Sequence, residues 1–288
     1  MINRGINFIK RMYNLLEVNK ALARAAATKD LIHLDKQNPL TWEFSGFSQN
    51  GEDGLLDYLI KQLKISDRDF LEIGSSNGVE NNTAWLAVAK RFSGIMVEGS
   101  EEAVQKAKKF VDQFCIGVDV FNLWVNVKNC KDLINKMSSL SPDIFSIDID
   151  GNDYYITKSL MDLGLRPKII IVEYNSAFGP LESKTIEYDK HMLIRNGKGM
   201  DFSEETRLYY GVSIKGWQNY FSSIGYRFVT VDSNGVNAVF MDPDHFDTDF
   251  VNQIKGINFQ ENFFQMRFFK TNWENQFEKI RHLDFLDI

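Results

Sequence analysis

Short apolar runs alternate with amphipathic stretches along most of the chain. Residues 70–73, 94–98, 114–119, 142–151 and 168–175 contain runs that are mostly apolar and read as buried strands. In the stretches between them, apolar residues recur every three to four positions, which is the period of a helix with one buried face. Alternating buried strands and amphipathic helices predict an α/β fold whose mostly parallel sheet is covered on both faces.

The last two apolar segments of this region follow a different arrangement. Residues 226–231 and 237–241 flank Ser233-Asn234-Gly235, a turn sequence that is typical of a hairpin. The two strands of a hairpin are antiparallel, so one of them must run against the rest of the sheet. The sequence therefore predicts a mostly parallel sheet with a reversed C-terminal hairpin strand.

Three segments lie outside the alternating pattern. Residues 2–27 have helical periodicity, residues 176–212 form a long insertion that we expect to act as a lid, and residues 244–288 are rich in phenylalanine. We divide the chain into an N-terminal helical extension at 1–40, a central domain at 41–243 and an aromatic C-terminal extension at 244–288. Both extensions are expected to pack on the domain or in a homodimer. The basic N-terminal helix has a second interpretation, binding to an anionic membrane surface.

Composition and charge narrow the function classes. Hydrophobic residues make up 44% of the 288 residues and charged residues 25%, as in ordinary globular proteins. The net charge of −6 disfavours a nucleic acid as the main partner. The two cysteines, Cys115 and Cys130, have no metal-binding spacing and are expected to be reduced. With neither a secretory signal pattern nor an apolar run of ~18–20 residues, the expected location is cytoplasmic.

The turn after the first predicted strand is the first candidate for chemistry. Residues 70–78 read Phe-Leu-Glu-Ile-Gly-Ser-Ser-Asn-Gly and join a buried strand to a helix. Glycine permits a sharp turn and a close approach to a ligand, at the sheet edge where open α/β folds bind their ligands. Glu98 ends the next strand, twenty residues after Gly78, where a carboxylate can accept hydrogen bonds from both ribose hydroxyls. We therefore predict a nucleoside site.

A second polar segment, residues 48–54, reads Ser-Gln-Asn-Gly-Glu-Asp-Gly and precedes a predicted helix. Ser, Asn and Asp are favoured at helix N-termini, so the segment is interpreted equally well as a capping cluster. It lies one helix before the glycine turn, and its polar groups are also placed to face the same ligand. Both interpretations stay open at this point.

Taken together, these segments resemble the class I S-adenosylmethionine-dependent methyltransferases, within the FkbM-like group of polysaccharide and capsule gene clusters. The matching segments are 48–53, 70–78, 80–83, 97–99, 146–155, 172–175, 178–180 and 209–211. The resemblance spans roughly residues 48–241 and implies a Rossmann-like class I methyltransferase sheet, in which the last strand is reversed. It departs at the centre of the turn, where the usual Gly-x-Gly is Gly74-Ser75-Ser76.

The resemblance also implies the cofactor S-adenosylmethionine and assigns residues to it. Glu72 would face the methionine ammonium group, residues 74–78 would line the methionine portion, Glu98 would bind the ribose, and Asp119 would approach the adenine amine. The complete predicted set for the cofactor is Gln49, Asp53, Glu72, Gly74, Ser75, Asn77, Gly78, Asn82, Thr83, Glu98, Gly99, Ser100, Asp119 and Asp148.

Acidic side chains at two neighbouring strand ends form the candidate catalytic group. Methyl transfer to a hydroxyl requires removal of a proton, either by a general base or with the help of a metal ion. Asp148 and Asp150 follow the fourth predicted strand, and Glu173 and Asn175 end the fifth. Oxygen ligands at one sheet edge suit Mg²⁺ or Mn²⁺, in an arrangement that resembles catechol-type O-methyltransferases. Helix capping and orientation of substrate hydroxyls are the alternatives.

We accordingly predict Asp150 and Glu173 as catalytic residues, and these two with Asn175 as metal ligands. His191, in the insertion, is a further candidate base because histidine titrates near neutral pH. The predicted substrate-binding residues are Asn152, Tyr154, Asn175, Tyr209 and Tyr210.

The sequence and the resemblance together suggest an O-methyltransferase that acts on a small molecule. The expected acceptor is a sugar, a nucleotide-linked precursor or a phosphoramidate-type precursor of capsule polysaccharide. The alternative is a non-catalytic nucleoside-binding module that recruits capsule-biosynthesis enzymes through the two extensions.

Overall fold

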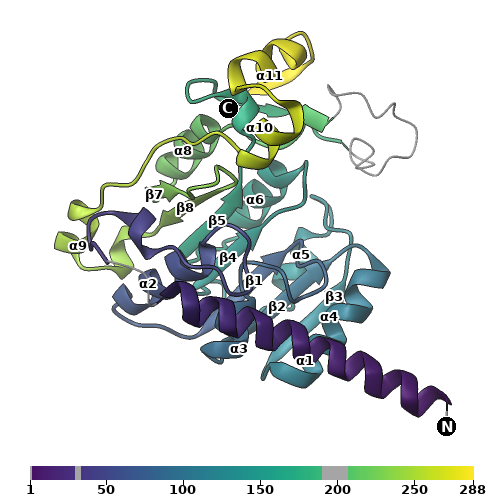
Figure 1. The fold of residues 1–288 in the computed structure, drawn as a ribbon. Helices are drawn as coiled ribbons and strands as arrows, with labels where there is room; N and C mark the ends of the chain where they lie inside the picture. The colour runs from purple at the N-terminus through teal and green to yellow at the C-terminus, as the bar shows by residue number, and fades with distance from the viewer. Residues whose placement is uncertain (1, 30–33, 190–206) are drawn as a thin grey trace.

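A seven-stranded sheet forms the centre of the protein, for which a computed structural model describes residues 2–29, 34–189 and 207–288 (Figure 1). Its strand order is β3-β2-β1-β4-β5-β8-β7. The strands are β1 (Asp69–Ile73), β2 (Ser93–Glu98), β3 (Val118–Asn122), β4 (Ile144–Ile147), β5 (Ile169–Glu173), β7 (Arg227–Val231) and β8 (Asn237–Met241). The first five are parallel, and β8 runs antiparallel to both β5 and β7. The predicted fold class is therefore confirmed.

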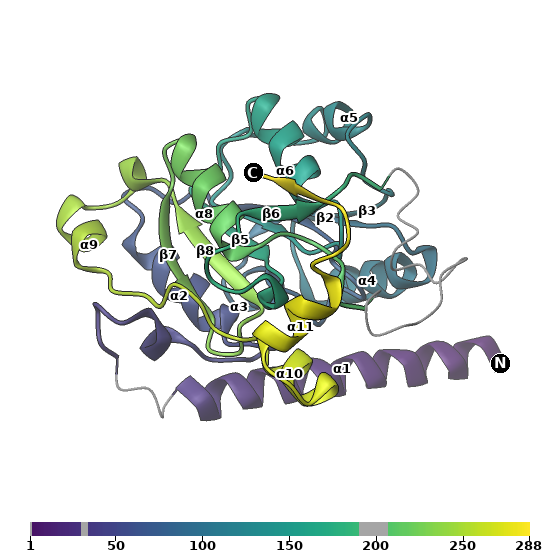
Figure 2. The ribbon, with the colours of Figure 1, turned by 90° about the horizontal axis from the view of Figure 1, so that it is seen from above.

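Helices cover both faces of this sheet, as Figure 2 shows from above. On one face pack α1 (Ile2–Lys29), α2 (Glu52–Gln62), α3 (Ala84–Ala89) and α4 (Glu101–Phe114). On the other face pack α5 (Cys130–Ile134), α6 (Asp153–Asp162) and α8 (Ile214–Ser223). Successive residues of a strand point to opposite faces, so Ile169 and Ile171 belong to the first core and Ile170 and Val172 to the second. The uninterrupted apolar run of β5 follows from this double burial.

The third strand begins later than its sequence pattern indicates. Helix α4 continues to Phe114, whose ring packs 5.7 Å from that of Phe110 on the core side of the helix. The chain then turns at Gly117, which has a φ of +72°. The strand that we predicted at 114–119 is therefore at Val118–Asn122. An apolar helix end and an apolar strand start look alike in the sequence, and the glycine turn separates them.

The C-terminal extension completes the domain. It contains η3 (Pro243–His245), α9 (Thr248–Gln253), α10 (Phe263–Phe269), α11 (Trp273–Ile280) and the unexpected strand β9 (Phe285–Asp287). Strand β9 pairs with β6 (Lys184–Ile186), which lies in the predicted insertion. Figure 1 shows α10 and α11 at the opposite end of the molecule from α1. Residues 190–206 of the insertion lie outside the described part of the chain.

None of the helices in the described residues has the length and apolarity needed to cross a bilayer. Helix α1 is the longest, and its C-terminal half packs on the domain through Val18, Ala21 and Ala25. The guanidinium group of Arg24 donates hydrogen bonds to the carbonyl oxygens of Gly46 and Ser48. The helix is thereby attached to the segment that leads into α2.

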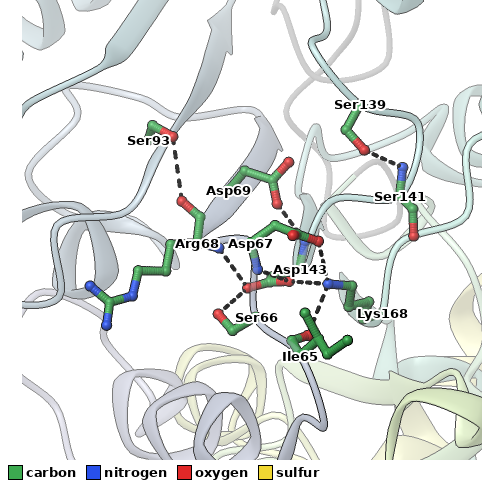
Figure 3. A network of polar contacts seen from close by, with 10 residues as sticks. All are labelled: Ile65, Ser66, Asp67, Arg68, Asp69, Ser93, Ser139, Ser141, Asp143 and Lys168. Carbon is green, nitrogen blue, oxygen red and sulfur yellow. Dashed lines mark hydrogen bonds and ion pairs between the residues drawn. The ribbon is translucent and has the colours of Figure 1, made fainter.

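A buried ionic network ties the amino ends of three central strands together (Figure 3). Lys168, which precedes β5, lies 2.8 Å from the carboxylate of Asp143 before β4 and 2.6 Å from Asp67 before β1. The Asp143 carboxylate also accepts backbone N–H bonds from Asp67 and Arg68. The three charged residues, Asp67, Asp143 and Lys168, come from three different strand starts, so the network aligns these strands. This edge is opposite the one that carries the candidate site.

Candidate functional site

A cavity of about 610 Å³ lies at the carboxyl edge of the sheet. Its walls come from the turn after β1, the loops after β2, β3 and β4, and the segment before α2. The predicted residues that line it are Gln49, Glu72, Gly74, Asn77, Asn82, Glu98, Gly99, Asp148, Asp150 and Asn152. Strand order brings these positions together, because β1 lies between β2 and β4.

The glycine turn is shaped by close backbone packing. Gly74 has a φ of +90°, and a Cβ at this position would lie 1.8 Å from the carbonyl oxygen of Asp148. Only glycine fits both constraints. Ser76 stands where the resembled family has a second glycine, and it adopts a φ of +48°. Serine thus takes the left-handed conformation that glycine adopts without strain, and its N–H donates to Glu98 at 2.9 Å.

Glu72 is buried beside this turn and is held by two neighbours. One carboxylate oxygen accepts the backbone N–H of Asn82 at 2.9 Å, and the other accepts the hydroxyl of Thr83 at 2.5 Å. Burial raises the pKa of Glu72 to about 7, with a further upward contribution from the charge of Asp148. A cationic group in the cavity would favour the ionised form of this carboxyl.

Glu98 faces the opposite side of the turn. Its carboxylate accepts backbone N–H bonds from Ser76 and Ser100, at 2.9 and 2.7 Å. These bonds fix the carboxylate at the end of β2, and each oxygen keeps a lone pair for a ligand. The hydroxyl of Ser100 caps α4 by accepting from Ala103, so Ser100 supports the loop from outside the cavity lining.

The structure does not place Asp119 at this cavity, contrary to its predicted contact with the adenine amine. Asp119 is exposed at the second position of β3, level with Ile95, whereas Asn122 is level with Glu98. The later start of β3 explains the difference, because the residue that ends the strand lies three positions further on. Leu123, Trp124 and Val125 line the cavity there instead.

Trp124 is a residue that the sequence reasoning missed. Its ring packs on the backbone of Gly99, where a Cβ would lie 2.2 Å from a ring carbon. The side chain remains 45% exposed although it lines the cavity. An aromatic face beside Glu98 is suited to a planar base next to a ribose. The sequence neighbours Leu123 and Val125 are apolar, so the local sequence does not distinguish Trp124 from a core residue.

Three carboxylates meet at the ends of β4 and β5. Asp148, Asp150 and Glu173 each offer an oxygen, and these oxygens lie within 4.8 Å of one another. Burial raises the pKa of Glu173 well above its usual value, and the charges of Asp148 and Asp153 add to this effect. Asp150 adopts a φ of +60°, a strained conformation that other contacts must maintain. Hard divalent cations bind to such oxygen groups.

Asn175 is not part of this group, although we predicted it as a metal ligand and a substrate contact. It is fully buried and caps the short helix η2 (Ser176–Phe178), accepting the N–H of Ala177 at 3.0 Å. Its amide nitrogen donates to the carbonyl oxygens of Leu208 and Tyr210. After β5 the chain bends into η2, so Asn175 leaves the plane of the sheet. Asp148 takes its place in the carboxylate group.

Several other predicted residues support the site from outside the cavity lining. Asp53 accepts the backbone N–H groups of Gly46, Phe47 and Ser48 with one carboxylate oxygen, so it shapes the preceding segment instead of facing a ligand. Burial raises its pKa to about 7. The remaining members are Ser75, which is fully buried, Gly78, which packs on Ala107, and Thr83, which binds Glu72.

The predicted substrate residues separate into two groups. Asn152 lines the cavity and exchanges two hydrogen bonds with the backbone of Asp189, at 2.7 and 3.0 Å. Tyr154 packs on Tyr220 and Trp217 in the second core, and Tyr209 binds the carbonyl oxygen of Asp284, so neither lines the cavity. Tyr210 is buried outside the cavity lining, and its hydroxyl accepts a hydrogen bond from Gln265. His191 lies outside the described residues.

The segment before α2 contributes side chains that we had not predicted. Glu52 lines the cavity and accepts hydrogen bonds from the side chains of Asn50 and Asn237, at 2.9 and 2.6 Å. Asn237 opens β8, so the segment is attached to the reversed strand of the sheet. Gln49, which we did predict, donates to Glu80 across the cavity mouth. The contact between Glu52 and Asn237 joins residues 185 positions apart and carries no local sequence signal.

No family model and no curated protein matches the chain. Among solved structures, an O-methyltransferase from Bacillus cereus in complex with SAH is 18% identical, with a TM-score of 0.43 over 78% of this chain and 89% of that one. The O-methyltransferase TomG from Streptomyces achromogenes, involved in tomaymycin synthesis and in complex with SAM, is 15% identical, with a TM-score of 0.44 and the same coverage. Likenesses this weak carry no argument about activity, and the fold class stands on the strand order.

Proposed function

We propose that this protein is an S-adenosylmethionine-dependent methyltransferase. The observation that carries the proposal is the pair of carboxylates, Glu72 and Glu98, held on either side of the Gly74–Gly78 turn at the edge of one cavity. Glu72 is placed for the methionine ammonium group and Glu98 for the ribose diol. Trp124 and Gly99 offer a flat surface beside Glu98 for the adenine.

The charge of the cavity supports a cationic cofactor. Seven acidic residues line it, namely Glu52, Glu72, Glu80, Glu98, Asp148, Asp150 and Asp189. S-adenosylmethionine carries a sulfonium and an ammonium group against one carboxylate. Negative potential in a confined cleft raises the local concentration of such a ligand.

The reaction that we propose is transfer of the methyl group to a hydroxyl oxygen. The oxygen forms a bond to the methyl carbon while the carbon–sulfur bond breaks and its electrons return to sulfur. The hydroxyl proton leaves to a carboxylate, for which we propose Asp150, which lines the cavity, or Glu173, which lies outside the lining but within 4.8 Å of Asp148 and Asp150. Holding oxygen and sulfur in line supplies much of the rate enhancement.

The acceptor that we propose is a small molecule, either a sugar or a nucleotide-linked or phosphoramidate-type precursor of capsule polysaccharide. This part of the proposal rests on the sequence resemblance to FkbM-like proteins. Glu52, Asn50 and Asn152 supply hydrogen-bonding groups to the part of the cavity away from the glycine turn, as a hydroxylated acceptor requires.

The test compares two carboxylates, one inside and one outside the cavity. We expect Glu98→Gln to weaken the affinity for S-adenosylhomocysteine by about 10-fold or more, because a charge-assisted hydrogen bond to the ribose is lost. Asp119→Asn removes an equal charge from the neighbouring strand and should leave the affinity unchanged. Calorimetric titration measures both. If wild-type protein does not bind S-adenosylhomocysteine, the proposal is wrong.

Transfer itself is tested with radiolabelled S-adenosylmethionine against neutral sugars, nucleotide sugars and phosphorylated sugars. Labelled product in one class identifies the acceptor. Cofactor binding without transfer to any of them favours the nucleoside-binding module that is the alternative function.

The carboxylate group of Asp148, Asp150 and Glu173 fits a divalent cation, and we propose Mg²⁺ or Mn²⁺ as its ligand. A bound cation would lower the pKa of the acceptor hydroxyl and favour its ionised form. We expect excess chelator to abolish transfer and added Mn²⁺ to restore it, while the affinity for S-adenosylhomocysteine stays the same. Full activity in excess chelator would contradict the metal proposal, and a carboxylate would then remove the proton without a cation.

A further inference from the structure

The C-terminal extension reaches the carboxylate group through a single buried side chain. Gln265 of α10 is 9% exposed and projects between η2 and the segment that carries Tyr210. Its amide nitrogen donates to the Tyr210 hydroxyl at 3.0 Å and to the Asn175 side chain at 3.2 Å. Tyr210 in turn hydrogen bonds to the carboxyl group of Glu173. The chain of contacts thus runs from Gln265 through Tyr210 to Glu173.

The orientation of the Gln265 amide is fixed by its other neighbours. Its oxygen accepts the hydroxyl of Ser176 at 3.0 Å, and that hydroxyl oxygen accepts the N–H of Asn262 at 2.9 Å. Asn262 also caps α10 by accepting the N–H of Gln265 at 3.1 Å. The cap and the serine therefore hold the amide nitrogen toward Tyr210.

The orientation of the Gln265 amide determines the hydrogen-bonding role of the Tyr210 hydroxyl. A phenol has one hydrogen to donate, together with lone pairs that accept. Gln265 donates to the Tyr210 oxygen, and in its hydrogen bond to Glu173 the tyrosine is the donor, which lowers the pKa of Glu173 against the larger effect of burial. The donated bond also polarises the hydroxyl, which strengthens its own donation. Tyr210 is 2% exposed, so water does not compete for these contacts.

We propose that Gln265 is a positioning residue for Glu173, acting through Tyr210, and that this is a function of the C-terminal extension. The inference rests on the proposed methyltransferase function for its catalytic meaning. The arrangement holds one carboxylate of the Asp148, Asp150 and Glu173 group in a single direction. An apolar side chain of similar size would fill the same space but would not make the hydrogen bonds to Tyr210 and Ser176.

A double-mutant cycle on stability tests the connection without any substrate. We expect Gln265→Leu and Glu173→Gln to be non-additive by about threefold or more in the unfolding equilibrium constant measured in urea. The coupling should disappear when the cycle is repeated with Tyr210→Phe. The matched control is Gln276→Leu, a glutamine of α11 that is also buried and donates to the Thr271 carbonyl oxygen. It should be additive with Glu173→Gln.

Two further measurements separate positioning from a structural role. With an acceptor in hand, Gln265→Leu should lower kcat about 10-fold and leave the KM for S-adenosylmethionine unchanged. Should Gln265→Leu fail to fold, Gln265→Glu replaces it. The new carboxylate keeps the size and accepts the tyrosine hydrogen, so it should also uncouple Glu173.

Additive effects in the wild-type background, or coupling that persists in Tyr210→Phe, would overturn the inference. Absence of methyl transfer by the wild-type protein would instead reject the proposed function, and the stability cycle would still decide the positioning of Glu173.

Discussion

At the scale of single residues, the site contains unusual backbone conformations and a carboxyl group whose pKa is raised by burial. Gly74 occupies a position where any Cβ would overlap the backbone of Asp148, which follows β4, and Ser76 and Asp150 adopt left-handed conformations. Such conformations persist only where surrounding contacts determine them, and they concentrate at functional sites. Glu72 is the clearest chemical case, because burial keeps its pKa near 7.

The pKa of Glu72 makes a prediction about stability. Its pKa of about 7 in the folded state exceeds the ordinary value of 4.5, so the folded state holds a proton that the unfolded state releases as pH rises above 4.5. Its contribution to stability is fully present below pH 4.5 and is lost as pH rises to about 7. The loss amounts to as much as about 3 kcal/mol, at 1.36 kcal/mol for each pKa unit.

We therefore expect the unfolding free energy of Glu72→Gln to fall less between pH 4.5 and 7.5 than that of the wild type. Urea unfolding at several pH values measures both curves. The difference in slope isolates Glu72, since the other acidic groups are common to the two proteins. Parallel curves would show that Glu72 has an ordinary pKa in the folded state.

At the scale of elements, an ionic network holds the strands together at the amino edge of the sheet, and the candidate site lies at the carboxyl edge. The Lys168 network at one edge joins the starts of β1, β4 and β5, and the ends of the same strands carry Glu72, Asp148 and Glu173 (Figure 3). Rigid strands at one edge therefore set the positions of functional side chains at the other.

We expect Lys168→Met to destabilise the protein by about 3–5 kcal/mol, because Asp143 would be left buried with its charge unpaired. Lys158→Met is the matched control, since Lys158 pairs with Asp162 on the surface and such pairs contribute about 0–1 kcal/mol. Denaturant unfolding compares the two variants. Equal effects would mean that the network contributes no more than a surface pair.

At the scale of the whole molecule, the C-terminal extension packs closely on the central domain. Phe246 is fully buried in the core beside α2, and β9 completes a small sheet with β6. Gln265 connects the extension to Tyr210. From these contacts we propose that one folding unit extends across the boundary that we drew at residue 243.

A matched pair of phenylalanines tests this boundary. Phe246→Ala should cost about 3–5 kcal/mol of stability, because it empties a fully buried position. Phe268→Ala, at a side chain that is 59% exposed, should change stability by less than about 0.5 kcal/mol. Urea unfolding measures both. Similar small effects would support a domain that ends near residue 243.

The sequence alone determined the features that depend on local periodicity and turn chemistry. The alternation of strands and helices, the reversed hairpin at 226–241 and the glycine turn at 74–78 were all visible, because each follows from neighbours within a few residues. The positions of Glu72 and Glu98 at strand ends followed from the same patterns.

Tertiary structure alone decided which polar side chains face the cavity and which satisfy the backbone. Asp53 and Asn175 resemble ligand residues in the sequence, yet N–H groups that packing brings near them occupy one side-chain oxygen of each. Trp124 contacts Gly99 and Gln265 contacts Tyr210 only in the folded chain, and neither residue has a local sequence signal for its contact. A polar group binds whichever partner packing brings nearest, and a local pattern contains no information about partners far away in the chain.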